Sequence, residues 1–121
     1  MANKARGEVT LALGGETYVL RLEFGVIAEI EDELDTAMIR LGMKIEQIQL
    51  RAKELLRTVQ VIVKANGYEV AEETLAEALA KDGVAAAMAP LIVYVRNYAF
   101  GSREENGQDT ELPAGSKSAA G

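Results

Sequence analysis

The chain has 121 residues and a formal net charge of -6, with 19 acidic and 13 basic side chains. This is the length of a single domain, and the acidic balance argues against general affinity for nucleic acid or anionic membranes. Cysteine and histidine are both absent, which excludes a disulfide framework, thiolate or imidazole metal ligands and the commonest acid-base catalyst. Since no apolar run has the length of a signal peptide or a membrane span, we expect a soluble cytoplasmic protein.

The stretch from Glu8 to Gly25 predicts a β-hairpin. Apolar residues alternate with polar or small ones on both sides of Gly14-Gly15, the pattern of two strands joined by a two-residue turn. The predicted pairs, which gather the large apolar side chains on one face, are Leu13 with Glu16, Leu11 with Tyr18 and Val9 with Leu20. The same register sets Glu8 opposite Arg21 as an attractive cross-strand pair. Because an isolated hairpin is marginally stable, helices must cover its apolar face.

Helical spacing of apolar residues follows the hairpin. Four helices are predicted before the last one: from about Val26 to Leu34; a short second helix capped by Asp35 or Thr36 and stopped by Gly42; a third with an apolar stripe from Ile48 to Val63 that ends at Asn66-Gly67; and a fourth from Glu72-Glu73 to Asp82-Gly83.

The last helical pattern covers Val84 to Ala99 and contains Pro90. Proline removes a backbone donor, so either the helix kinks there or a new helix begins with Pro90 in its first turn; we favour the kink. Residues 102–121 contain one large apolar side chain, Leu112, and cannot bury enough surface to fold. The sequence therefore predicts an α+β domain over residues 1–101, a two-stranded antiparallel hairpin packed on four to five helices, and a disordered tail over residues 102–121.

An acidic run, EIEDELD, places five carboxylates at residues 29–35. Successive side chains on a helix diverge by about 100°, so only pairs such as Glu29 and Glu33 share a face. A solvated helix face is therefore favoured over a cation site or a pair of catalytic carboxylates. The Gly14-Gly15 turn leads into a strand, whereas a phosphate-binding loop leads into a helix. We predict no metal site, no cofactor and no catalytic residues.

The stretch from Arg40 to Lys64 has six basic and two acidic side chains, a local balance of 6 - 2 = +4. This is the one region that suits an acidic partner, and a helix-turn-helix nucleic-acid binder is one alternative. The overall negative charge and the lack of a basic arm or interleaved aromatic residues argue against that alternative.

Soft and aromatic side chains are the best candidates for a partner-binding surface, with core packing as the alternative for each. Tyr94 and Tyr98 lie four residues apart, off the main stripe of Leu91 and Val95, and predict a partly exposed ridge. The candidate partner-binding residues are Met38, Met43, Met88, Tyr94, Tyr98 and Phe100.

Three short motifs resemble those of a known family. They are Arg6-Gly7-Glu8 before the hairpin, Phe24-Gly25 followed by Ala28-Glu29-Ile30-Glu31 in the first helix, and Phe100-Gly101 at the end of the last helix. From Arg6 to Gly101 the chain resembles the small tail proteins of gene transfer agents and related prophages. That family is described under phage tail tube proteins and is regarded as one of tail assembly chaperones.

The resemblance implies a cytoplasmic assembly factor of a phage-like tail, which holds the long helical tape-measure protein and helps recruit tube subunits. It transfers no catalytic residues and no cofactor. A structural tail tube component, retained in the particle, is the alternative that the resemblance leaves open, and a small nucleic-acid-binding protein is the second. A holdase of this kind predicts an exposed apolar groove and a homo-oligomer.

Overall fold

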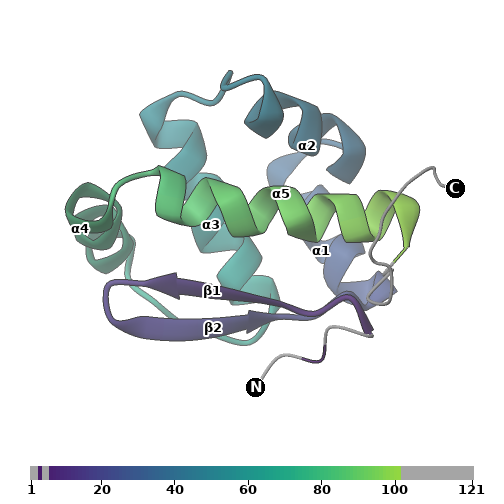
Figure 1. Cartoon of the computed structure of the whole chain (residues 1–121), viewed down its shortest axis with the longest axis horizontal. Coiled ribbons are helices and arrows are strands. Elements are labelled where there is room, and N and C mark those ends of the chain that lie inside the picture. The colour runs from purple at the N-terminus through teal and green to yellow at the C-terminus, as the bar shows by residue number, and fades with distance from the viewer. Residues whose placement is uncertain (1–2, 4–5, 102–121) are drawn as a thin grey trace, which may run out of the picture.

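The computed structural model describes residue 3 and residues 6–101, which form a two-stranded sheet and five helices (Figure 1). The elements are β1 (Val9–Leu13), β2 (Glu16–Leu20), α1 (Phe24–Leu34), α2 (Met38–Glu46), α3 (Ala52–Ala65), α4 (Glu72–Asp82) and α5 (Ala85–Phe100). This confirms the predicted α+β fold of a hairpin on helices. The predicted disordered tail, residues 102–121, lies outside the described residues.

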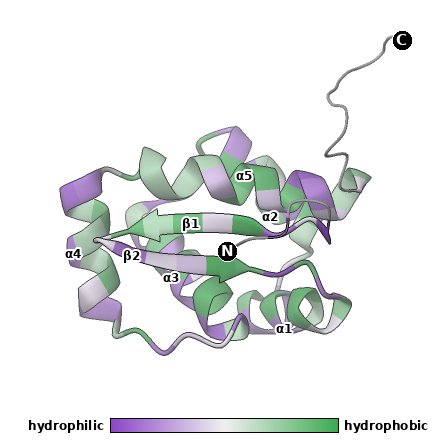
Figure 2. Cartoon of the chain, turned by 60° about the horizontal axis from the view of Figure 1, so that its bottom comes forward, coloured by the Kyte–Doolittle hydropathy of each residue, from purple (hydrophilic) through white to green (hydrophobic). Residues whose placement is uncertain are grey.

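The helices enclose one face of the hairpin. Helix α5 packs along β1 and α3 packs on β2, while α2 lies against α5 and α1 against α3. Figure 2 shows the hairpin with α5 beside β1 and α4 at the turn end. At that end the backbone N–H of Gly14 donates to Asp82 Oδ2 at 2.7 Å. Helices α4 and α5 meet at an angle of 106°, so α4 closes the end of the layer that α5 covers.

The hairpin has the predicted register, with Leu13 opposite Glu16, Leu11 opposite Tyr18 and Val9 opposite Leu20. Both turn glycines have positive φ, 63° for Gly14 and 81° for Gly15, which is the requirement of a type I′ turn.

The predicted contact between Glu8 and Arg21 is not among the ion pairs of the described residues. Arg21 Nη1 lies 3.0 Å from Glu23 Oε1 instead, because residues two apart in an extended chain project to the same side. Glu8 Oε1 accepts from the backbone N–H of Asn3 at 2.7 Å.

Side chains from the end of α3 and the following linker occupy the outer edge of β2. The N–H of Val19 donates to the hydroxyl of Tyr68 at 2.9 Å, and the N–H of Arg21 donates to Asn66 Oδ1 at 2.6 Å. Asn66 is buried and its Nδ2 donates in turn to the carbonyl of Ile62 at 2.9 Å. These two outward-facing N–H groups, at and just beyond the end of β2, are thus satisfied within the domain.

The predicted cap and stop of α2 are wrong. The N-cap residue is Ala37, and Glu31 Oε2 accepts the N–H of Met38 at 2.8 Å. A side chain from α1 therefore caps the first turn of α2, the role predicted for Asp35 or Thr36. Asp35 follows α1 with φ 52°. Gly42 lies inside α2 and is buried, because it faces α5 rather than a turn.

The end of α2 carries an isoleucine where glycine is usual. The N–H of Ile48 donates to the carbonyl of Ile45 at 3.1 Å, and the N–H of Gln49 donates to the carbonyl of Lys44 at 2.8 Å. This is the Schellman pattern, and Ile48 occupies its left-handed position with φ 55°. Ile48 is 78% exposed, so the prediction that the apolar stripe of α3 starts there is wrong.

Replacing Ile48 with glycine should raise the free energy of unfolding by about 0.5–1 kcal/mol, because glycine adopts the left-handed conformation without a Cβ clash. Urea denaturation followed by circular dichroism measures the change. Gln49→Gly is the matched control, since Gln49 does not have positive φ, and it should destabilise. Equal losses of stability in the two variants would contradict the strained conformation at Ile48.

Helices α3 and α4 end where the sequence predicts. Helix α3 ends before Asn66-Gly67, with φ 97° at Gly67, and α4 ends before Gly83. Helix α5 continues through Pro90, so the alternative of a new helix beginning at Pro90 is wrong.

Within residues 6–101 no single helix is long and apolar enough to span a bilayer; only α4 and α5 taken together, bent by 106°, have such a length and composition.

Candidate functional site

The carboxylates of α1 do not converge. Glu29, Asp32 and Glu33 are exposed, Glu31 accepts the N–H of Met38, and Glu33 Oε1 lies 3.7 Å from Arg57 Nη2. In the described part of the chain, no group of three or more potential ligand residues could hold a metal ion. The acidic run therefore forms a solvated helix face.

Helices α2 and α5 approach each other closely at Gly42. A Cβ atom placed on Gly42 would lie 2.4 Å from Val95 Cγ1, too close for any side chain at this position to keep, and 3.1 Å from Val95 Cβ. The glycine thus allows the two backbones to meet, and the side chains beyond this contact stand on either side of a shallow depression.

This depression is a groove of about 410 Å³, called here the α2–α5 groove. Ile39 and Met43 are four residues apart and project from one side of α2, as do Ile92 and Ala99 from α5. The full lining is Ile39, Gly42, Met43, Glu46, Ile92, Val95, Arg96, Ala99 and Phe100.

The groove is mostly apolar and open to solvent. Phe100 is 77% exposed, Met43 54% and Ile39 53%. Arg96 Nε and Glu46 Oε2 form an ion pair across its rim at 2.9 Å. A concave apolar surface with few polar groups is suited to hold the apolar side of another protein segment, and it offers no nucleophile or acid-base pair.

The structure separates the six predicted partner-binding residues. Met43 and Phe100 line the groove, and Met88 and Tyr98 are partly buried against the core. Met38 is 1% exposed and Tyr94 is fully buried. The predicted Tyr94–Tyr98 ridge is therefore wrong for Tyr94, because α5 is covered by the hairpin on one side and α2 on another, which widens its buried face.

Sequence reasoning missed Ile39, Ile92 and the Glu46–Arg96 pair as groove residues. Ile39 lies between the apolar residues Met38 and Leu41, and Ile92 lies between Leu91 and Val95, so each widens the apolar stripe of its helix. The available signal was the width of those stripes, since α2 and α5 each carry more apolar positions than a single contact face can bury.

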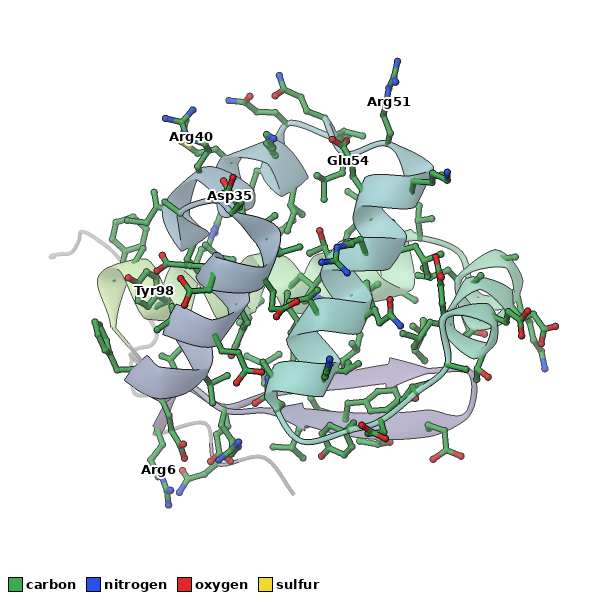
Figure 3. The ribbon with its side chains drawn as sticks, turned by 180° about the vertical axis from the view of Figure 1, so that it is seen from behind. Arg6, Asp35, Arg40, Arg51, Glu54 and Tyr98 are labelled. Carbon is green, nitrogen blue, oxygen red and sulfur yellow. The ribbon has the colours of Figure 1, made fainter. Side chains whose placement is uncertain are left out.

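The basic stretch forms a surface of mixed charge. A second hollow of about 540 Å³ is lined by Arg40, Lys44, Lys53 and Arg57, but also by Glu33, Asp35 and Glu54. Figure 3 shows Arg40 and Arg51 projecting from the same end of the molecule as Asp35 and Glu54. Glu54 Oε1 accepts the backbone N–H of Arg51 at 2.8 Å. The local excess of positive charge is thus interrupted by carboxylates, which disfavours a phosphate-backbone contact.

The described residues thus form a small α+β domain, a hairpin on five helices with an exposed apolar groove. The sequence matches the model of the family described as phage tail tube protein, GTA-gp10, over residues 6–100. The chain belongs to this family, which confirms the resemblance seen in its motifs. No curated protein and no solved structure matches the chain.

Proposed function

We propose that this protein is an assembly factor of a phage-like tail, which holds a helical segment of the tape-measure protein and helps recruit tube subunits in the cytoplasm. The family supports a role among phage tail proteins. The observation that carries the finer proposal is the α2–α5 groove, where Ile39, Met43 and Phe100 leave apolar surface uncovered.

A helix lying in this groove would bury apolar residues spaced three and four apart along one face. Methionine suits such a role, because its unbranched, polarizable side chain adapts to different neighbours. A holding protein must accept several turns of a long partner, and an adaptable apolar groove meets that need better than a rigid polar site. The alternative is a structural tube component, which the family description names directly.

Phe100→Asp should reduce capture of the tape-measure protein at least tenfold when the two are co-expressed and purified by affinity. A carboxylate facing an apolar helix must lose its hydration without gaining a partner, and interface residues of this kind commonly contribute about 2 kcal/mol or more. Phe24→Asp is the matched control, since Phe24 is 81% exposed and is not among the residues that line the groove. It should leave capture unchanged.

Two outcomes would count against the proposal. Wild-type protein that captures no tape-measure protein but assembles alone into rings or tubes, seen by electron microscopy, would support the structural component instead. Equal loss of capture in Phe100→Asp and Phe24→Asp, with both variants folded, would place the partner surface outside the groove.

A further inference from the structure

We propose that a second copy of this chain covers the α2–α5 groove when no partner is bound, so that the free protein is a two-fold symmetric dimer. The exposed surface of the groove by itself supports the dimer. Its regulatory meaning, that binding of a partner helix displaces the second copy, rests on the proposed function.

Exposed apolar area on the groove is the first reason. Phe100, Met43 and Ile39 are each more than half exposed, and they border the same depression. Clustered apolar surface of this kind favours burial in an interface, whereas single exposed apolar residues do not.

The patch also contains both a projecting group and a space to receive one. A two-fold interface brings a patch against itself, so each copy must offer what the other accepts. Phe100 stands at the end of α5 with most of its ring exposed, and the groove beside it has a volume of about 410 Å³. An apolar cavity of about 150 Å³ is enough to hold benzene. The groove of one copy therefore has room for Phe100 of the other.

The charges at the rim are self-complementary. Glu46 and Arg96 carry opposite signs on one patch and form an ion pair whose side chains are 41% and 64% exposed. Exposed pairs of this kind are weak, so they can exchange partners. In a two-fold dimer, Glu46 of each copy can face Arg96 of the other. The exposed face of α1 cannot pair in this way, because Glu29, Asp32 and Glu33 are all negative.

The size of the patch sets the expected affinity. Stable interfaces bury about 800 Å² and involve about 20–30 residues on each partner, whereas nine residues line the groove. We therefore expect a weak dimer, with a dissociation constant in the micromolar range. A dimer of this strength would cover the groove at high protein concentration, and a longer apolar helix could displace the second copy from it.

Sedimentation equilibrium of the full chain, from about 1 to 200 µM, tests the proposal through a charge exchange. Glu46→Arg alone and Arg96→Glu alone should each weaken the dimer at least tenfold, because each places two like-charged pairs across the interface. An equimolar mixture of the two variants should dimerise as the wild type does, because each interface pair in the mixed dimer then joins opposite charges. An ion pair that acts only within one chain would give no such recovery.

Three results would overturn the proposal: a wild type that stays monomeric throughout this range, single variants that dimerise normally, or a mixture that shows no recovery. If the wild type is monomeric and Leu112→Asp makes it dimerise, the C-terminal segment occupies the groove. Capture of the tape-measure protein is measured separately. A monomer that captures it would refute the dimer alone, and a dimer that cannot be displaced by it would refute the proposed function alone.

Discussion

Replacing Tyr94 with alanine should lower the free energy of unfolding by about 3–5 kcal/mol, as is usual when a large buried aromatic side chain is truncated. Tyr94 is fully buried, and its hydroxyl donates to the carbonyl of Arg21 at 2.7 Å. One side chain on α5 thereby fills the core and fixes the end of β2. Urea denaturation measures the loss, and a folded domain with near wild-type stability would contradict this role.

Tyr94→Phe separates the hydrogen bond from the packing. This variant keeps the ring but leaves the carbonyl of Arg21 without the hydroxyl, so we expect a loss of about 1–2 kcal/mol. Tyr98→Phe is the matched control on the same helix, because Tyr98 is only partly buried, and it should change stability by less than about 0.5 kcal/mol. Equal effects of the two substitutions would show that the buried hydrogen bond contributes nothing.

Ionisation of Tyr94 should lower the free energy of unfolding at alkaline pH. Burial raises the pKa of Tyr94 above its usual value of 10.0, with opposing effects from Asn66 and the nearby charge of Arg21. Since the folded state favours the neutral hydroxyl, this contribution is complete below pH 10 and is lost as the pH rises toward the folded-state pKa. Tyr94→Phe should therefore show less alkaline destabilisation than the wild type.

Gly42→Val should lower the free energy of unfolding by at least about 2 kcal/mol and also disturb the groove. The added Cβ would meet Val95 at 2.4 Å, and a helical valine has one strongly preferred rotamer, so Val95 cannot turn aside freely. Helices α2 and α5 would have to separate, and overpacking of this kind commonly costs about 1–3 kcal/mol. Gly42→Ala should have a smaller effect, because alanine recovers about 1 kcal/mol of helix propensity.

Gly25→Ala is the control for helix propensity. Gly25 lies in α1, and a Cβ there would meet nothing within 4 Å, so the substitution should be neutral or stabilising. Denaturation curves and capture of the tape-measure protein are measured for both glycine variants. A Gly42→Val protein as stable as Gly25→Ala would show that the contact with Val95 is not as close as described.

Local patterns predicted the parts of the fold that local interactions determine. The register of the hairpin follows from alternation and from two glycines that can adopt positive φ, and the end of α3 follows from Gly67. Helix α2 could not be predicted in this way. Its end is a Schellman turn with Ile48 in place of glycine, and its internal Gly42 serves a contact with Val95, which is 53 positions further along the chain.

The candidate site was predicted only in part for a related reason. Met43 and Phe100 were chosen for their chemistry and do line the groove, whereas Tyr94 and Met38 were chosen on the same grounds and are core residues. Which apolar residues remain exposed depends on how many neighbours each helix acquires. For α5, that number is set by the hairpin and α2 together, and no local pattern reports it.

The partly occupied edge of β2 has a consequence for a protein that exposes apolar side chains. A bare strand edge can template the addition of further strands and lead to fibrils. Here the hydroxyl of Tyr68 and the amide of Asn66 already hold the edge N–H groups of Val19 and Arg21. Addition of a further strand along this part of the β2 edge is thereby discouraged, because the incoming strand would have to displace both hydrogen bonds.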